Sequence, residues 1–100
     1  MGEVTQELEV RFAKLTTRKY DFGVPNSPVG LHLACLSLGL QPGDEVIVPS
    51  LTFVATSNAA LYTGAEVCLA DIIGSDELTI DPGEIERLIK PNTKAIIVMH

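Results

Sequence analysis

Apolar residues in the first fifteen positions of the chain recur at the spacing of an α-helix. The series consists of Val4, Leu8, Phe12 and Leu15. Charged residues such as Glu7 and Arg11 lie between them, so one side of such a helix is apolar and the other is polar. The pattern predicts an amphipathic helix over residues 3–15.

A second apolar run predicts a helix over residues 28–38. Ser27 is suited to the N-cap, and Pro28 suits the first helical position because no N–H is needed there. Gly39 is placed to end the helix. The stretch LHLACLSL leaves almost no polar face, so we expect this helix to be buried on most sides, for example beneath a sheet.

Short apolar runs alternate with helical patterns along the rest of the chain. We expect strands over residues 45–49, 65–72 and 94–99, and helices over about 52–63 and 82–90. Asp81, Pro82 and Glu84 have the order of a capping box at the start of the last helix. Alternating apolar residues over 20–24 give a weaker strand signal, because Asp21 and Gly23 interrupt it.

This order of elements predicts an α/β fold with a mostly parallel sheet and helices on both faces. Ligands of such sheets bind beyond the carboxyl ends of the strands, so the loops over 25–29 and 49–53 are the expected binding region. No helix follows the last strand to cover it. We therefore expect residues 1–100 to be a single partial domain, with the helix over 3–15 followed by the start of a larger domain over 16–100.

The composition fits a packed domain and limits the classes of partner. The chain has 100 residues, of which 46% are hydrophobic and 20% charged, with a net charge of −6. The negative charge argues against nucleic acid or an anionic membrane as partner. No apolar stretch approaches the ~20 residues of a membrane span, and we expect a cytoplasmic protein. Cys35 and Cys68 lack a C-x-x-C or histidine cluster, which favours buried free thiols over a disulfide or metal site.

Residue spacing alone gives weak functional signals. Free N–H groups at residues 28–30 would attract a phosphate, although Pro28 has none to donate. Phe53 follows a strand and is suited either to stacking on a planar ring or to the core, and spacing alone favours the core. His32 is expected in the core, and Asp71 in a cap or turn. His100 follows the last predicted strand, a better position for function.

Several linked motifs, in the right order, resemble one enzyme family. They are LHLACLSLGLQPGDEVIVPSLTFVATSNAALYTGAEVCLADI and LTIDPGEIERLIKPNTKAIIVMH. From about Phe12 to His100 the chain resembles the N-terminal quarter of the DegT/DnrJ/StrS aminotransferases, which use pyridoxal phosphate to act on nucleotide-linked keto sugars. The resemblance implies the beginning of a fold-type-I aminotransferase large domain. It also implies a homo-oligomer, because members of the family are dimers that share active sites.

The resemblance places the cofactor-binding residues of this chain at Ser27, Pro28, Val29 and Phe53. Phe53 occupies the position of the aromatic residue that stacks on the cofactor ring. The loop over 26–30 matches the phosphate loop of the family, typically S-G-T-x-A, but Pro28 stands in place of its Thr and Ser27 in place of its Gly. Each lost hydrogen bond to a charged group is worth about 1.5–3 kcal/mol, so this loop is expected to bind phosphate weakly.

The family's Schiff-base lysine has no match in this chain. The lysines are Lys14, Lys19, Lys90 and Lys94, and each is expected to be solvated. No catalytic or metal-ligating residue is therefore predicted, and the chain alone is expected to be inactive. The resemblance implies amino transfer, with glutamate as donor, in a protein that supplies the missing residues. The alternatives are a truncated or degenerate non-catalytic α/β interaction module and a phosphate-binding module without catalysis.

Overall fold

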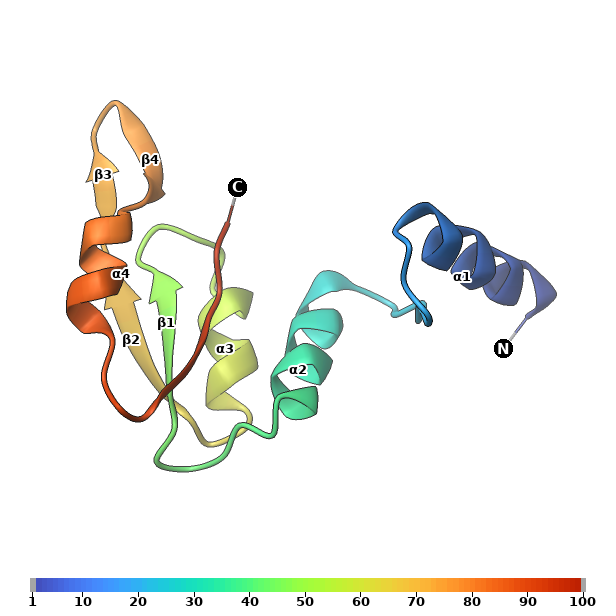
Figure 1. Cartoon of the computed structure of the whole chain (residues 1–100), viewed down its shortest axis with the longest axis horizontal. Coiled ribbons are helices and arrows are strands. Elements are labelled where there is room, and N and C mark those ends of the chain that lie inside the picture. Colours follow the sequence, from blue (N-terminus) through green and yellow to red (C-terminus); the bar gives the residue numbers. More distant parts are fainter. Residues whose placement is uncertain (1, 100) are drawn as a thin grey trace.

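The computed structural model describes residues 2–99, which form helices packed on a small parallel sheet, with a helical arm at the N-terminal side (Figure 1). The helices are α1 (Glu3–Leu15), α2 (Ser27–Ser37), α3 (Ala55–Leu61) and α4 (Pro82–Leu88). The strands are β1 (Glu45–Pro49), β2 (Glu66–Ala70), β3 (Ile72–Gly74), β4 (Glu77–Ile80) and β5 (Thr93–Ile96). The predicted α/β class is confirmed.

The main sheet is parallel and has the order β2-β1-β5, which places β1 in the centre. Val46 lies opposite Val67 of β2 on one side and Ala95 of β5 on the other. Every residue of β1 is buried, as expected for a central strand with covered faces. The β-branched residues of this strand suit a pleated surface that is packed on both sides.

The two faces of the sheet are covered by different helices. Val46 and Val48 belong to one hydrophobic cluster with Ala59 and Ala60, which places α3 on their face. Helix α2 packs beside α3 and adds the buried Cys35. Because side chains alternate along a strand, Ile47 points to the opposite face. Helix α4 packs against β2 (Figure 1). The expected arrangement of helices on both faces is confirmed.

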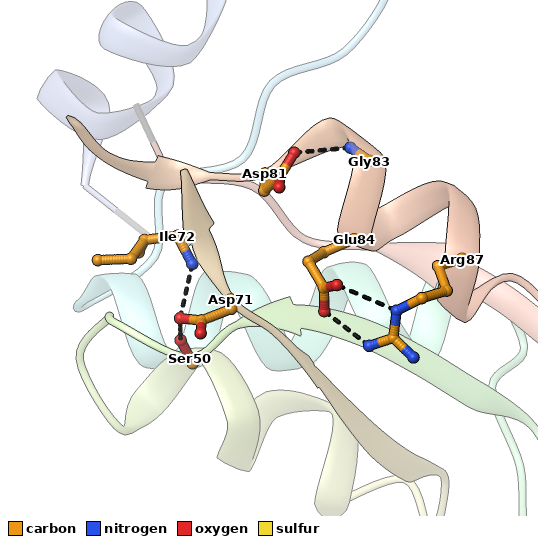
Figure 2. Close-up of polar contacts among 7 residues, drawn as sticks. All are labelled: Ser50, Asp71, Ile72, Asp81, Gly83, Glu84 and Arg87. Atoms are coloured by element: carbon orange, nitrogen blue, oxygen red, sulfur yellow. Dashed lines mark hydrogen bonds and ion pairs between the residues drawn. The ribbon is translucent and has the colours of Figure 1, made fainter. Parts of the chain in front are cut away.

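Three local predictions were wrong. Residues 20–24 form no strand, because they cross between α1 and α2 without a neighbouring strand to pair with. Strands β3 and β4 form an antiparallel hairpin between β2 and α4, where we expected no strand pair. Glu84 does not complete a capping box: Asp81 accepts from the Gly83 N–H at 2.8 Å, whereas Glu84 pairs with Arg87 (Figure 2).

Helix α2 is less buried than its sequence predicts. Only Cys35 is fully buried in this helix, while Leu33 and Leu36 are each 49% exposed. The reason is that α3 covers one side of α2, and the opposite side faces solvent within the described part of the chain. Burial raises the pKa of the Cys35 thiol, and both cysteines are free, with Cys68 half-buried.

Helix α1 forms an arm that projects away from the sheet (Figure 1). Its predicted apolar face is present but uncovered, with Val4 81% and Leu15 79% exposed. The arm contacts the connecting segment, where the Gly23 N–H donates to Glu9 Oε1 at 2.7 Å. The radius of gyration is 15.6 Å, compared with about 13 Å for a compact domain of this length.

A buried carboxylate fastens the amino-terminal edge of the sheet. Glu45 begins β1 with its side chain 7% exposed, and its Oε2 accepts from Lys90 Nζ at 2.9 Å. Its Oε1 accepts from Thr93 Oγ1 at 3.4 Å. Lys90 is exposed, as expected, with its side chain 54% accessible, but the turn after α4 also carries its ammonium group to Glu45.

Candidate functional site

A pocket of about 320 Å³ lies at the carboxyl edge of the parallel sheet, between the start of α2 and the ends of β1 and β5. We call it the carboxyl-edge pocket. It is lined by Ser27, Pro28, Leu31, Thr52, Phe53, Ala55, Thr56, Ile97, Val98 and Met99. Its location agrees with the rule that ligands of parallel sheets bind beyond the carboxyl ends of strands. The loops expected to bind a ligand therefore meet in space.

Three of the four predicted site residues line this pocket. Ser27 and Pro28 come from the first turn of α2, and Phe53 comes from the loop after β1. Phe53 is 72% exposed, so its ring is a surface of the pocket and not part of the core. Val29 is the exception, since it does not belong to the lining, and its N–H donates to Asn26 Oδ1 at 3.0 Å.

The N-cap of α2 is Asn26, one residue before the predicted Ser27. Asn26 has an extended backbone, and its side chain accepts from the Val29 N–H. Its carbonyl oxygen accepts from the Gly30 N–H at 3.2 Å. Ser27 is thereby released from capping, and Pro28 occupies the first turn, where a missing N–H costs nothing.

Hydroxyl groups and a thioether form the polar part of the pocket wall. Thr52 Oγ1 and Thr56 Oγ1 lie 3.0 Å apart in a hydrogen bond, and Thr52 Oγ1 also lies 3.5 Å from the sulfur of Met99. These contacts tie the loop after β1 to α3 and to the segment after β5. No local pattern in the sequence singles out these residues, although Thr52 falls in the predicted loop and Met99 at the end of a predicted strand.

Asp71 holds the beginning of the loop that carries Phe53 (Figure 2). Its Oδ1 accepts from the Ile72 N–H at 2.8 Å and from Ser50 Oγ at 3.3 Å. The Ser50 N–H in turn donates to the Ala70 carbonyl oxygen at 2.8 Å. Asp71 was expected in a cap or turn, and it lies instead at the junction between β2 and β3, where its side chain binds the first amide of β3. Figure 2 shows Ser50 and Asp71 facing each other where β1 and β2 end.

The other candidates lie elsewhere. His32 is half-buried and packs edge-on against the Tyr62 ring, with 5.3 Å between centroids. His100 lies outside the described residues. Over residues 2–99 no group of histidine, cysteine and carboxylate side chains could hold a metal ion. Over the same range, no helix has the length and apolarity needed to cross a membrane.

The arrangement suits a planar ring better than a charged group. Within residues 2–99, the lining is mainly apolar and contains no lysine, arginine or histidine. A flat aromatic ligand stacked on Phe53 would meet aliphatic side chains such as Leu31 and Ile97. Pockets of about 300–1,000 Å³ with this kind of lining are typical of small-molecule sites.

The chain is similar to several solved structures. One is a putative sugar aminotransferase from Streptococcus pneumoniae in its PLP form: it is 31% identical, with a TM-score of 0.88 over 96% of this chain and 24% of that chain. DesV from S. venezuelae is 36% identical, with a TM-score of 0.88 over 98% of this chain and 26% of that chain. NtdA from Bacillus subtilis, solved with bound PMP, is 33% identical, with a TM-score of 0.88 over 98% of this chain and 22% of that chain.

The three matches cover similar shares of the solved chains. The chain spans about a quarter of the length of each of these structures. The model of the DegT/DnrJ/EryC1/StrS aminotransferase family matches residues 1–100. The fold, the parallel sheet and the order of the elements therefore have an explanation in common descent, and this chain belongs to the DegT/DnrJ/EryC1/StrS aminotransferase family.

Proposed function

We propose that this chain forms one wall of a pyridoxal phosphate site in an aminotransferase. The proposed reaction moves an amino group from an amino acid, with glutamate as the expected donor, to a nucleotide-linked keto sugar. The observation that carries the proposal is the carboxyl-edge pocket, which brings Ser27 and Pro28 from the first turn of α2 together with Phe53 from the loop after β1. The family membership and the PLP and PMP forms of the similar structures support it.

The residues of this chain would hold and shield the ring of the cofactor. When bound, the cofactor supplies an electron sink at the substrate's α-carbon. Phe53 offers the face on which the ring stacks, and the bond between Thr52 and Thr56 keeps the Phe53 loop on α3. The aliphatic side chains of Leu31 and Ile97 line the pocket and would help to exclude water from the bound ring.

We also propose that the chain does not transaminate by itself. Amino transfer through this cofactor needs a lysine as covalent anchor and proton carrier. The carboxyl-edge pocket has no lysine in its lining. Lys90 is paired with Glu45 at the opposite edge of the sheet, and Lys19 lies 5.0 Å from the Tyr20 ring centroid near α1. A complete site therefore requires a lysine from outside residues 2–99.

A second candidate function is a non-catalytic interaction module, and the exposed apolar surface favours it. Helix α2 exposes Leu33 and Leu36, each by 49%, and its C-cap residue Leu38 is 64% exposed. Exposed apolar faces of this kind drive association. The same faces support the homo-oligomer expected from the resemblance, which stays a prediction, as does the cytoplasmic location. Sedimentation of the purified chain over a range of concentrations tests self-association directly.

The cofactor-site proposal is tested by titrating the chain with pyridoxamine phosphate and following side-chain NMR shifts. This form of the cofactor has no aldehyde, so it does not react with surface lysines. We expect shifts at Phe53 and Thr56, and a several-fold loss of affinity in Phe53→Ala, because an aromatic pair contributes about 0.5–1.5 kcal/mol. Phe22→Ala is the matched control, since Phe22 is similarly exposed, at 75%, and lies outside the pocket. Equal losses in the two variants would refute the stacking role.

A further inference from the structure

The first turn of α2 has few donors left for an anion. A helix N-terminus binds phosphate through its free N–H groups. Here the Val29 N–H is taken by Asn26 Oδ1, and the Gly30 N–H by the Asn26 carbonyl oxygen. Pro28 has no N–H. Within the described residues, Ser27 alone in this turn keeps an N–H and a hydroxyl outside these bonds.

The rest of the carboxyl-edge pocket does not replace those donors. A phosphate dianion in a protein is held by Lys or Arg, or by several converging N–H and hydroxyl donors. Among the residues that the structure describes, the lining has no basic side chain. The hydroxyls of Thr52 and Thr56 are hydrogen-bonded to each other at 3.0 Å. The chain also carries a net charge of −6, which disfavours any anion at long range.

We propose that this pocket recognises a planar heteroaromatic ring through Phe53 and leaves the phosphate group of such a ligand in solvent. Asn26 and Pro28 set this preference. Asn26 accepts hydrogen bonds from two N–H groups of the first turn, and Pro28 has no N–H to donate. The inference rests on the proposed cofactor site and specifies which part of the ligand this chain binds. It departs from the phosphate loop that the family resemblance implies for residues 26–30.

The test compares three probes by NMR titration of the full chain. They are pyridoxamine phosphate, pyridoxamine, which differs only in lacking the phosphate, and inorganic phosphate. We expect the first two to bind with affinities within about threefold of each other, and inorganic phosphate at 50-fold excess to displace neither. Pyridoxamine phosphate that binds more than tenfold tighter than pyridoxamine, and is displaced by phosphate, would overturn the inference while leaving the cofactor site intact. Absence of binding by both ring compounds would overturn the cofactor site and the inference together.

A single substitution is expected to create phosphate binding and so tests the inference in the opposite direction. Pro28→Thr restores an N–H and adds a hydroxyl in the first turn, while Asn26 still caps the helix. We expect at least tenfold tighter binding of pyridoxamine phosphate, with the affinity for pyridoxamine unchanged. Pro82→Thr is the matched control, because Pro82 also lies in the first turn of a helix, α4, and is outside the pocket. An equal affinity of the Pro28→Thr variant and the native chain for pyridoxamine phosphate would show that this turn does not face the phosphate.

Discussion

Gly64 allows the loop after α3 to approach the turn before β1, and replacing it by alanine is expected to destabilise the sheet. Gly64 has a φ of +83°, and a Cβ built on it would lie 2.9 Å from Pro42 Cγ and 3.2 Å from Pro42 Cδ. The pyrrolidine ring cannot rotate away, so the loop or the turn must shift. Gly39, at the end of α2, has a φ of +70° but has no atom within 4 Å of a built Cβ.

The two glycines separate backbone strain from steric overlap. A left-handed backbone costs a non-glycine residue about 1–2 kcal/mol, and the less flexible unfolded state of alanine offsets about 0.4–1 kcal/mol of this. Gly39→Ala should therefore lower the free energy of unfolding by about 1 kcal/mol. Overpacking adds about 1–3 kcal/mol, so Gly64→Ala should lower it by about 2–4 kcal/mol.

Urea unfolding followed by far-ultraviolet circular dichroism measures both variants. For a domain of this size each 1 kcal/mol corresponds to about 4–8 °C in Tm, so thermal melts give a second reading. The double variant Pro42→Ala/Gly64→Ala should be more stable than Gly64→Ala, because the ring that causes the overlap is gone. Equal destabilisation in Gly39→Ala and Gly64→Ala would refute the contact with Pro42 as the source of the difference.

Three further predictions concern the core, the amino edge and the carboxyl edge. Ile47→Ala should cost about 2–5 kcal/mol in urea unfolding, because Ile47 is fully buried in the central strand. The hydrogen bond to Glu45 raises the pKa of Lys90. The stabilisation from this pair is therefore present below the unfolded-state pKa of about 10.4 and is lost as the pH rises through the folded-state pKa. Lys90→Met should flatten the fall of Tm at alkaline pH relative to Lys94→Met, and parallel Tm profiles of the two variants would contradict this. Asp71→Ala should speed hydrogen exchange of the Ile72 amide, because this amide donates to the carboxylate, and should leave exchange of the Ser50 amide unchanged, because that amide donates to the Ala70 carbonyl oxygen. Unchanged exchange at Ile72 would contradict the role of Asp71 in holding the start of β3.

The sequence predicted the elements whose signals are local. The strand over 45–49 was placed at the observed bounds, and the helix over 28–38 was displaced by one residue from Ser27–Ser37. Both elements are bounded by proline and glycine residues, which mark where a helix or strand begins and ends. The hairpin over 72–80 was missed because its strands are short and pair with each other, so neither has the continuous apolar pattern of a buried strand. The exposure of α2 was also mispredicted, since an apolar helix does not encode which of its faces is covered.

For the candidate site, residue identity and spatial arrangement have separate origins. The sequence by itself determined the alternation of buried strands and helices, the chemical nature of Phe53 and the missing N–H of Pro28, because these follow from side-chain type and local periodicity. Only the tertiary structure decided that Pro28 and Phe53 face one pocket and that Val29 donates to Asn26. The physical reason is that strand order and cap geometry depend on packing and on hydrogen-bond competition, which act between residues and leave no local pattern in the chain.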